Sequence, residues 1–243
     1  MDFLVKAPAT PGDYVFKLTD TAQFARPAPV TVLTLRVEGS AMSMDFPTPE
    51  NYPAFPRFLN DITAADVQPS DTNPAKQRTL DFGWDDPKKK KPGPDNAGKA
   101  PGFLINGKKF SGIEYDQEMV LGAIEEWTLE NSTANIAHPF HIHINPFQVV
   151  EIFDPNAGTS YKPTGNYVWQ DVIAIPPATF NADGTVKEKG RVTIRHRFVD
   201  FVGSYVLHCH MLGHEDRGMM ELVAVVPTKA DVGKKDQLLP QHH

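Results

Sequence analysis

Short segments with strand character recur along the second half of the chain, and they limit the possible folds more than any other feature of the sequence. They are rich in β-branched and aromatic residues and are separated by turn-forming residues. They occupy residues 102–106, 125–130, 147–153, 168–175, 190–198, 203–209 and 219–226. No long helical pattern lies between them. A series of short strands at this spacing predicts an antiparallel β-sandwich or barrel.

The N-terminal part of the chain has a different composition. Residues 13–19 and 29–38 have strand character, but two strands alone do not make a stable sheet. Fourteen of the 22 prolines lie within the first 101 residues, so we expect a long connector with one short strand at 79–84. The sequence therefore predicts the terminal strands of an incomplete preceding domain, a proline-rich connector, a β domain and a tail, which occupy residues 1–46, 47–101, 102–228 and 229–243.

Composition excludes several classes of protein. The chain has 24 Lys and Arg against 30 Asp and Glu, a net charge of −6, which argues against a nucleic-acid partner because phosphates need a basic surface. No apolar run approaches the roughly 20 residues that a membrane helix needs, and no signal peptide is visible. The one cysteine, Cys209, rules out an intrachain disulfide.

The histidines gather in two places. None of the nine precedes residue 138, and six lie within 138–143 and 208–214. Side chains alternate between faces along an extended chain. His141 and His143 therefore share one face, and His208 and His210 share another, with Cys209 pointing the opposite way. His196 matches no motif, and we expect an ordinary hydrogen-bonded histidine there.

Cys209 is followed along the chain by two further metal-binding side chains, His214 and Met219. Together with His138 they supply two imidazoles, one thiolate and one thioether. A blue-copper electron-transfer site uses this ligand set, with two His and a Cys in a trigonal plane and a weak axial Met. Zinc does not need the methionine, so the set favours redox chemistry with copper.

The remaining histidines converge from two His-X-His segments and form a second predicted metal site. Neutral imidazoles suit copper, and zinc or iron is also possible on ligand type alone. Cys209 lies between two of these histidines in the sequence and gives electrons a short covalent route between the sites. The members of this second site are His141, His143, His208 and His210.

These motifs resemble a known family. HPFHIH followed by NPFQV, and then HCHMLGHEDRGMM, resemble the C-terminal cupredoxin domain of multicopper oxidases, the laccase-like family. FLINGKKF, EEWTLEN, WQDVIAIPP and RHRFVDFVGSYVLHCH resemble successive parts of that domain, and PGDYVFKLTDT and TVLTLRVEG resemble the end of the family's middle domain. The resemblance implies an all-β, cupredoxin-like Greek-key sandwich or barrel that binds copper, in a periplasmic or secreted protein.

The resemblance also implies a role for each matching residue. A type 1 copper, which takes electrons from a small-molecule or metal-ion donor, would be held by His138, Cys209, His214 and Met219. His141 would bind the type 2 copper. Type 3 copper would be held by His143, His208 and His210. In the family, type 2 and type 3 copper form a trinuclear cluster that reduces dioxygen to water.

The chain departs from the family at this cluster. The family uses eight histidines, half of them from an N-terminal domain, whereas residues 1–137 of this chain contain no histidine. We therefore expect that the chain is a fragment, or that a missing N-terminal domain or another chain supplies the other ligands. The alternative is a stand-alone type 1 copper electron-transfer protein without dioxygen chemistry.

Two carboxylates follow His214 directly. Glu215 and Asp216 are candidate catalytic residues, because reduction of dioxygen to water consumes protons and a nearby carboxylate can relay them. Two other roles remain open for them. Either carboxylate can orient a metal ligand by accepting a hydrogen bond, or it can pair with Arg217.

Overall fold

The chain forms two compact units, Met1–Pro56 and Arg57–His243. The computed structural model describes residues 5–18, 29–43, 45–48, 50, 53–54, 56–67, 77–85, 102–164 and 167–234. The first unit contains the antiparallel hairpin of β1 (Gly12–Leu18) and β2 (Val30–Val37). This hairpin confirms the two strands expected in the N-terminal part. None of the described residues of this unit is buried, so the hairpin has no core of its own.

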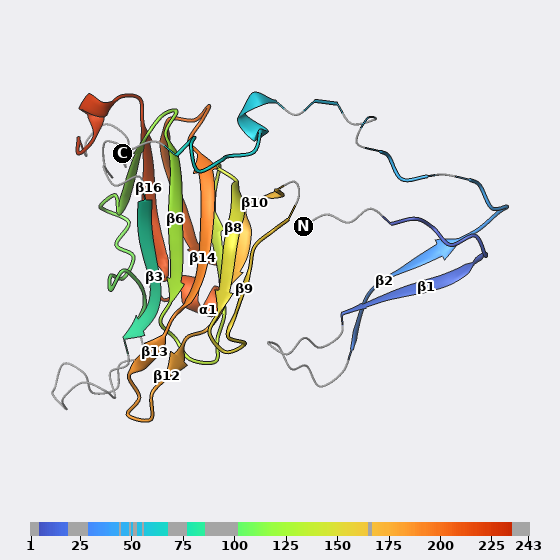
Figure 1. The fold of residues 1–243 in the computed structure, drawn as a ribbon, viewed down its shortest axis with the longest axis horizontal. Coiled ribbons are helices and arrows are strands. Elements are labelled where there is room, and N and C mark those ends of the chain that lie inside the picture. The colour runs from blue at the N-terminus through green and yellow to red at the C-terminus, as the bar shows by residue number, and fades with distance from the viewer. Residues whose placement is uncertain are drawn as a thin grey trace. The chain divides into compact units, whose positions relative to one another are not determined.

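The second unit is built around two large sheets (Figure 1). The first sheet runs in the order β10-β8-β14-β6-β3-β4, with β9 paired to β8. Figure 1 shows β3, β6, β14 and β8 side by side as one layer. The bounds of this sheet are β3 Gln77–Asp85, β4 Gly102–Ile105, β6 Ile124–Asn131, β8 Phe147–Asp154, β9 Thr159–Tyr161, β10 Trp169–Gln170 and β14 Gly190–Arg197.

The second sheet carries the histidine motifs and runs in the order β11-β7-β15-β16-β5. Its bounds are β5 Gln117–Val120, β7 His138–Ile142, β11 Val172–Ile175, β15 Gly203–Cys209 and β16 Met220–Val226. A separate hairpin joins β12 (Thr179–Phe180) to β13 (Val186–Glu188). Helical segments among the described residues include the 3-10 turns Arg57–Leu59 and Lys229–Asp231 and the short helix α1 (Leu212–Glu215). This architecture confirms the all-β prediction.

Alternating burial shows why these sequences become strands. Side chains along β6 and β14 are buried at every second position, which is the pattern of a strand with one face on a core. The buried faces of the two sheets meet in one cluster that includes Trp127, Phe140, Phe147 and Leu207. Cys209 and Met219 belong to the same cluster, so the predicted copper ligands are built into the hydrophobic core.

The strand expected inside the connector is confirmed and has a larger role than the sequence suggested. β3 pairs antiparallel with β4 and parallel with β6, so it is an inner strand of the first sheet. A second parallel pair joins β16 to β5. The two sheets are therefore mixed, whereas the sequence pattern predicted antiparallel pairing throughout.

Residues 57–67 also belong to the second unit. The indole N–H of Trp169 donates to the carbonyl of Leu59 at 2.6 Å, and the Ile62 N–H donates to the side-chain oxygen of Gln148 at 2.9 Å. Residues 68–76 and 86–101 of the predicted connector lie outside the described residues. The domain boundaries taken from the sequence stay a prediction, and the structure adds that β3 and this segment share a compact unit with residues 102–228.

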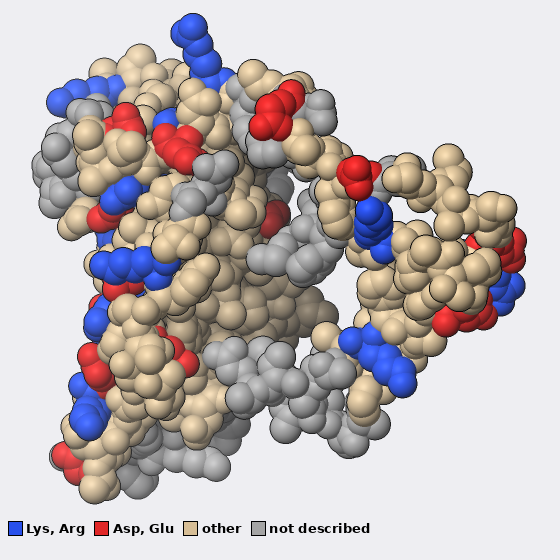
Figure 2. Space-filling view, turned by 45° about the vertical axis from the view of Figure 1, so that its right-hand side comes forward, with Lys and Arg blue, Asp and Glu red and all other residues tan. Residues whose placement is uncertain are grey.

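Charges of both signs are interspersed on the surface. Figure 2 shows Lys and Arg side chains among Asp and Glu over the visible face. Several make ion pairs across the first sheet: Lys189 with Asp81 and Glu130, and Arg195 with Glu126. Among the described residues, no helix has both the length and the apolar character of a membrane span.

Candidate metal centre

Neighbouring strands bring the predicted type 1 ligands to one end of the second sheet. His138 is the first residue of β7, and Cys209 is the last residue of β15, which pairs antiparallel with β7. The Cys209 N–H donates to the carbonyl of Met219 at 3.0 Å, so Met219 lies directly across from Cys209. His214 lies in α1, between these two residues. We call His138, Cys209, His214 and Met219 the cysteine cluster.

Three donor atoms of the cysteine cluster face one another. The Cys209 Sγ lies 3.5 Å from His138 Nδ1 and 3.7 Å from His214 Nδ1, and the two Nδ1 atoms are 3.3 Å apart. All three side chains are buried, and their ligand atoms lie within 4.8 Å of one another, a spacing that could hold a metal ion. A thiolate with two imidazoles is a soft ligand set that suits copper. The residues present therefore fit the metal that the sequence predicts.

Burial controls the protonation of these donors. It lowers the pKa of His138 to about 3 and raises the pKa of Cys209 to about 11. It also lowers the pKa of His214, and the positive charge of Arg217 adds to that shift. Without metal, the cluster is therefore neutral, with the thiol protonated and the imidazoles unprotonated. On binding a metal cation, Cys209 would lose its thiol proton, and the resulting thiolate would compensate part of the cation's charge.

A hydrogen-bond chain orients the His138 ring. Thr133 Oγ1 lies 2.9 Å from His138 Nε2, and Thr133 in turn contacts Asn131, whose Oδ1 is 2.7 Å from Oγ1 and accepts the Thr133 N–H at 2.8 Å. When His138 Nε2 donates to Thr133, the Nδ1 lone pair is free and faces Cys209. This support is not evident from the sequence. Its only signal was a pair of polar residues shortly before the HPFHIH motif.

Aromatic stacking fixes the second imidazole. The ring of Phe103 stacks on His214 with centroids 4.1 Å apart and an interplanar angle of 16°. The Arg217 guanidinium lies 4.3 Å from the Phe103 centroid, and its Nε donates to the carbonyl of Gly213 at 2.6 Å. Phe103 comes from β4, so the first sheet helps to position a ligand carried by the second.

The remaining predicted ligands form a second group, which we call the histidine cluster: His141, His143, His208 and His210. The Cα atoms of His141 and His208 are register partners across β7 and β15, and their ring centroids are 5.2 Å apart. His143 Nε2 lies 3.3 Å from His208 Nε2, and the His210 ring lies 5.4 Å from that of His141. The convergence expected from strand alternation is confirmed, because both His-X-His pairs meet in this cluster.

The two clusters differ in their exposure to solvent. His143 and His210 are exposed and His141 is half-buried, while His208 is 5% exposed. The His141 Nδ1 is 2.9 Å from the carbonyl of Asp171, which leaves its Nε2 free for another partner. The ligand atoms of His141, His143 and His208 lie within 4.8 Å of one another. The histidine cluster is thus a surface site that can bind metal but is open on one side.

The two predicted catalytic carboxylates have different surroundings. Glu215 Oε2 lies 3.2 Å from His208 Nδ1. Asp216 is exposed at the C-terminal end of α1. Among the described residues, only Glu215 of this pair forms an ion pair with a histidine of either cluster. The structure therefore brings Glu215, and not Asp216, to the histidine cluster.

The expectation for His196 is wrong. Its ring is fully buried, and in the described structure neither ring nitrogen has a hydrogen-bond partner. The ring packs instead against Trp127 and Phe198, with centroid distances of 4.4 and 4.5 Å. Burial, with a smaller contribution from Arg78, lowers its pKa to about 3. His196 is thus a neutral core residue, and His242 and His243 lie outside the described residues.

A mixed β-sheet fold with a buried cysteine–histidine cluster beside a set of converging imidazoles is typical of copper proteins of the cupredoxin type. Residues 81–229 match the family model described as multicopper oxidase. That match covers more than half of the chain and includes every residue of both clusters. The chain therefore belongs to the multicopper oxidase family.

Individual relatives agree with this assignment. A multicopper oxidase of Staphylococcus aureus is 32% identical over 124 residues, which is 50% of this chain and 24% of that protein. A laccase of Bacillus stratosphericus is 34% identical over 111 residues, or 44% of this chain and 21% of that protein. In fold, the chain is similar to a multicopper oxidase from Campylobacter jejuni, with a TM-score of 0.56, 21% identity and coverage of 91% of this chain and 42% of that one.

The chain spans about a quarter of the length of these curated relatives. The family-model match, at residues 81–229, contains both clusters.

Proposed function

We propose that this chain is the C-terminal, copper-binding part of a laccase-like multicopper oxidase. The whole protein would couple one-electron oxidation of a small-molecule or metal-ion donor to the reduction of dioxygen to water. The observation that carries the proposal is the position of Cys209, which belongs to the cysteine cluster and is covalently flanked by His208 and His210 of the histidine cluster. Copper supplies the one-electron redox chemistry when bound.

Each residue of the cysteine cluster has a defined task in this proposal. His138, Cys209 and His214 would hold type 1 copper through the three donor atoms that face one another, and Met219 would be the weak axial ligand. Thr133 keeps the His138 proton on Nε2. Because the cluster is buried, water is excluded from it.

The histidine cluster would supply half of a trinuclear centre. In the proposal, His141 binds type 2 copper, and His143, His208 and His210 bind type 3 copper. The exposure of His143 and His210 supports a further element that completes the site, either an N-terminal domain or another chain. Glu215 accepts the His208 Nδ1–H and so turns Nε2 toward His143. The proton-relay role of Glu215 and Asp216 stays a prediction.

A stand-alone electron-transfer protein needs only the cysteine cluster. It gives no reason for two His-X-His segments to place ligand atoms within 4.8 Å of one another. The proposal of an oxidase accounts for both clusters and is preferred for this reason.

Visible absorption and electron paramagnetic resonance of the copper-loaded chain test the proposal. We expect an intense blue colour from charge transfer between the Cys209 thiolate and Cu(II), and Cys209→Ser should abolish it. His210→Ala is the matched control, since it removes a neighbouring ligand of the other cluster and should leave the colour intact. A copper-loaded wild-type chain without strong visible absorption would contradict the type 1 assignment.

A further inference from the structure

The turn that follows His143 is strained. Ile144 has a φ of 65°, in the left-handed region that β-branched residues strongly avoid. Its side chain is 52% exposed, so tight packing of the side chain does not force this conformation. The N–H of Asn145 donates to the carbonyl of His143 at 2.7 Å and closes a three-residue turn. Something else in the structure must hold the turn in place.

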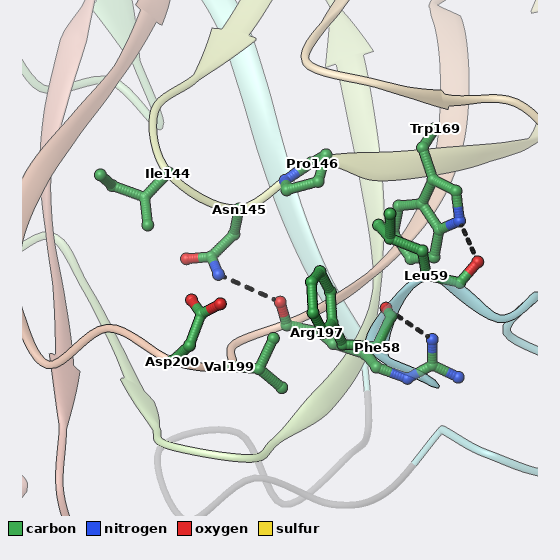
Figure 3. A pocket seen from close by; sticks show the side chains of 9 residues that line it. All are labelled: Phe58, Leu59, Ile144, Asn145, Pro146, Trp169, Arg197, Val199 and Asp200. Atoms are coloured by element: carbon green, nitrogen blue, oxygen red, sulfur yellow. Dashed lines mark hydrogen bonds between the residues drawn. The ribbon is translucent and has the colours of Figure 1, made fainter. Parts of the chain in front are cut away.

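The side chain of Asn145 holds the turn through two hydrogen bonds. It is 3% exposed, and its Oδ1 accepts a hydrogen bond from the Tyr205 hydroxyl at 2.7 Å. Its Nδ2 donates to the main-chain carbonyl of Arg197 at 3.2 Å, as Figure 3 shows beside the small pocket that Ile144 also lines. Asn145 therefore ties the turn to the end of β14 and to the middle of β15.

This tie lies close to the contact between His143 and His208, whose Nε2 atoms are 3.3 Å apart. Tyr205 lies three residues before His208 on β15. A main-chain hydrogen bond also lies at this point, from the His143 N–H to the carbonyl of Val206 at 3.2 Å. Beyond that bond, β7 has ended and the chain turns away. Without the side-chain tie, the turn is free to relax toward ordinary φ values, and His143 would move with it.

We propose that the Asn145–Tyr205 hydrogen bond is a latch that holds the strained Ile144 turn and thereby positions His143 opposite His208. The latch rests on the proposed metal-binding function of the histidine cluster. Asn145 and Tyr205 are positioning residues, because they act through His143. Burial raises the pKa of the Tyr205 hydroxyl, which keeps it protonated and able to donate.

Amide hydrogen exchange of the metal-free chain tests the latch directly. Tyr205→Phe removes the hydroxyl and keeps the ring. We expect exchange of the His143 and Asn145 amides to rise by about 10-fold, the equivalent of one lost hydrogen bond. Exchange of the Cys209 amide at the other end of the site should not change. Tyr161→Phe, at an exposed position, is the matched control. Equal His143 exchange in the wild type and Tyr205→Phe would overturn the proposal.

The strain has its own test, which does not require Tyr205→Phe to fold. Ile144→Gly and Ile144→Ala both remove the side chain. At ordinary φ angles alanine is the more stable of the two, whereas at positive φ glycine is favoured. We expect Ile144→Gly to unfold at a higher urea concentration than Ile144→Ala. The reverse order would show that the turn is not strained and would overturn the latch.

Copper binding tests whether the latch affects the histidine cluster. In the Cys209→Ser background, Cu(II) titration reports on the histidine cluster. Adding Tyr205→Phe should weaken binding by about 10-fold, and further adding Ile144→Gly should recover most of that loss, because glycine adopts the turn without strain. Unchanged affinity in Tyr205→Phe would overturn the link to His143. If the Cys209→Ser chain binds no Cu(II), the proposed function of the cluster fails, while hydrogen exchange still decides the latch.

Discussion

The cysteine cluster and the histidine cluster meet in the consecutive residues His208, Cys209 and His210 at the end of β15. The two clusters nevertheless differ in how deeply their side chains are buried. The donors of the cysteine cluster are buried in the core between the sheets. In the histidine cluster only His208 is buried, His141 is half-buried, and His143 and His210 are exposed. In the proposed function, folding of this single unit would be enough to assemble the first site, whereas the second would need ligands from another element.

The two clusters also differ in the contacts that hold their histidine rings. His138 and His214 are fixed by Thr133 and Phe103, which come from within the same packed unit. In the histidine cluster, His141 is held by a main-chain carbonyl and His208 by Glu215. His143 depends on a strained turn. The buried cysteine cluster is therefore expected to be rigid without metal. The geometry of the histidine cluster depends on a few individual hydrogen bonds.

The largest expected difference between the clusters is in their pH dependence. Burial raises the pKa of Cys209 to about 11, so copper binding to the cysteine cluster releases a thiol proton at any lower pH. Its affinity should rise by about 10-fold per pH unit between about pH 7 and 9. Desolvation, which is only partial at the exposed His143, and the neighbouring histidines lower the pKa of His143 and His208. These two ligands are therefore already neutral in that range, and affinity at the histidine cluster should stay nearly constant.

Competition titrations with a chelator measure both dependences, with Cys209→Ser isolating the histidine cluster. If copper affinity changed equally with pH at the two clusters, the proposed difference in the protonation of their ligands would be contradicted.

A smaller effect is expected at Thr133. Thr133→Val keeps the shape but removes the acceptor for the His138 Nε2–H, and should weaken copper binding at the cysteine cluster by about 10-fold. Thr133→Ser should retain most of the affinity. Thr193→Val, in the middle of β14, is a control for the loss of a strand hydroxyl. The histidine cluster should bind Cu(II) as before. A wild-type affinity in Thr133→Val would show that packing alone orients His138.

The smallest effect on binding is expected at Met219. A long axial bond contributes more to redox potential than to affinity. Met219→Leu should therefore keep the copper and raise the potential, because a thioether that stabilises Cu(II) is removed. Redox titration of the blue absorption measures the shift. Loss of copper from this variant would mean that Met219 is a structural ligand rather than a tuning one.

The sequence predicts much of both clusters because their geometry follows from local rules. Alternation along extended segments is enough to separate Cys209 from His208 and His210, and strand composition is enough to predict the β-rich fold. The parallel pairing of β3 with β6 depends on contacts far apart in the chain, so no local pattern indicates it. The same holds for the stacking of Phe103 on His214 and for the left-handed turn at Ile144, which an isoleucine gives no reason to expect.

The surroundings of His196 also could not be predicted from the sequence. A histidine between two arginines on a strand has polar neighbours in the sequence, yet its ring points into the core between Trp127 and Phe198. Strand alternation places it inward, but only the packed structure shows that neither nitrogen finds a partner there among the described residues.

The central claim is that this chain alone builds one complete copper site and half of another. Copper analysis of the purified, chelator-dialysed monomer, combined with oxygen uptake, tests it most directly. The account predicts about one tightly held copper per chain, intense blue colour and no sustained oxygen consumption. Both copper content and turnover should rise when a chain carrying the missing His-X-His motifs is added. Three or more tightly held coppers per monomer with sustained oxygen uptake would contradict the account, because the histidine cluster would then be complete without a partner.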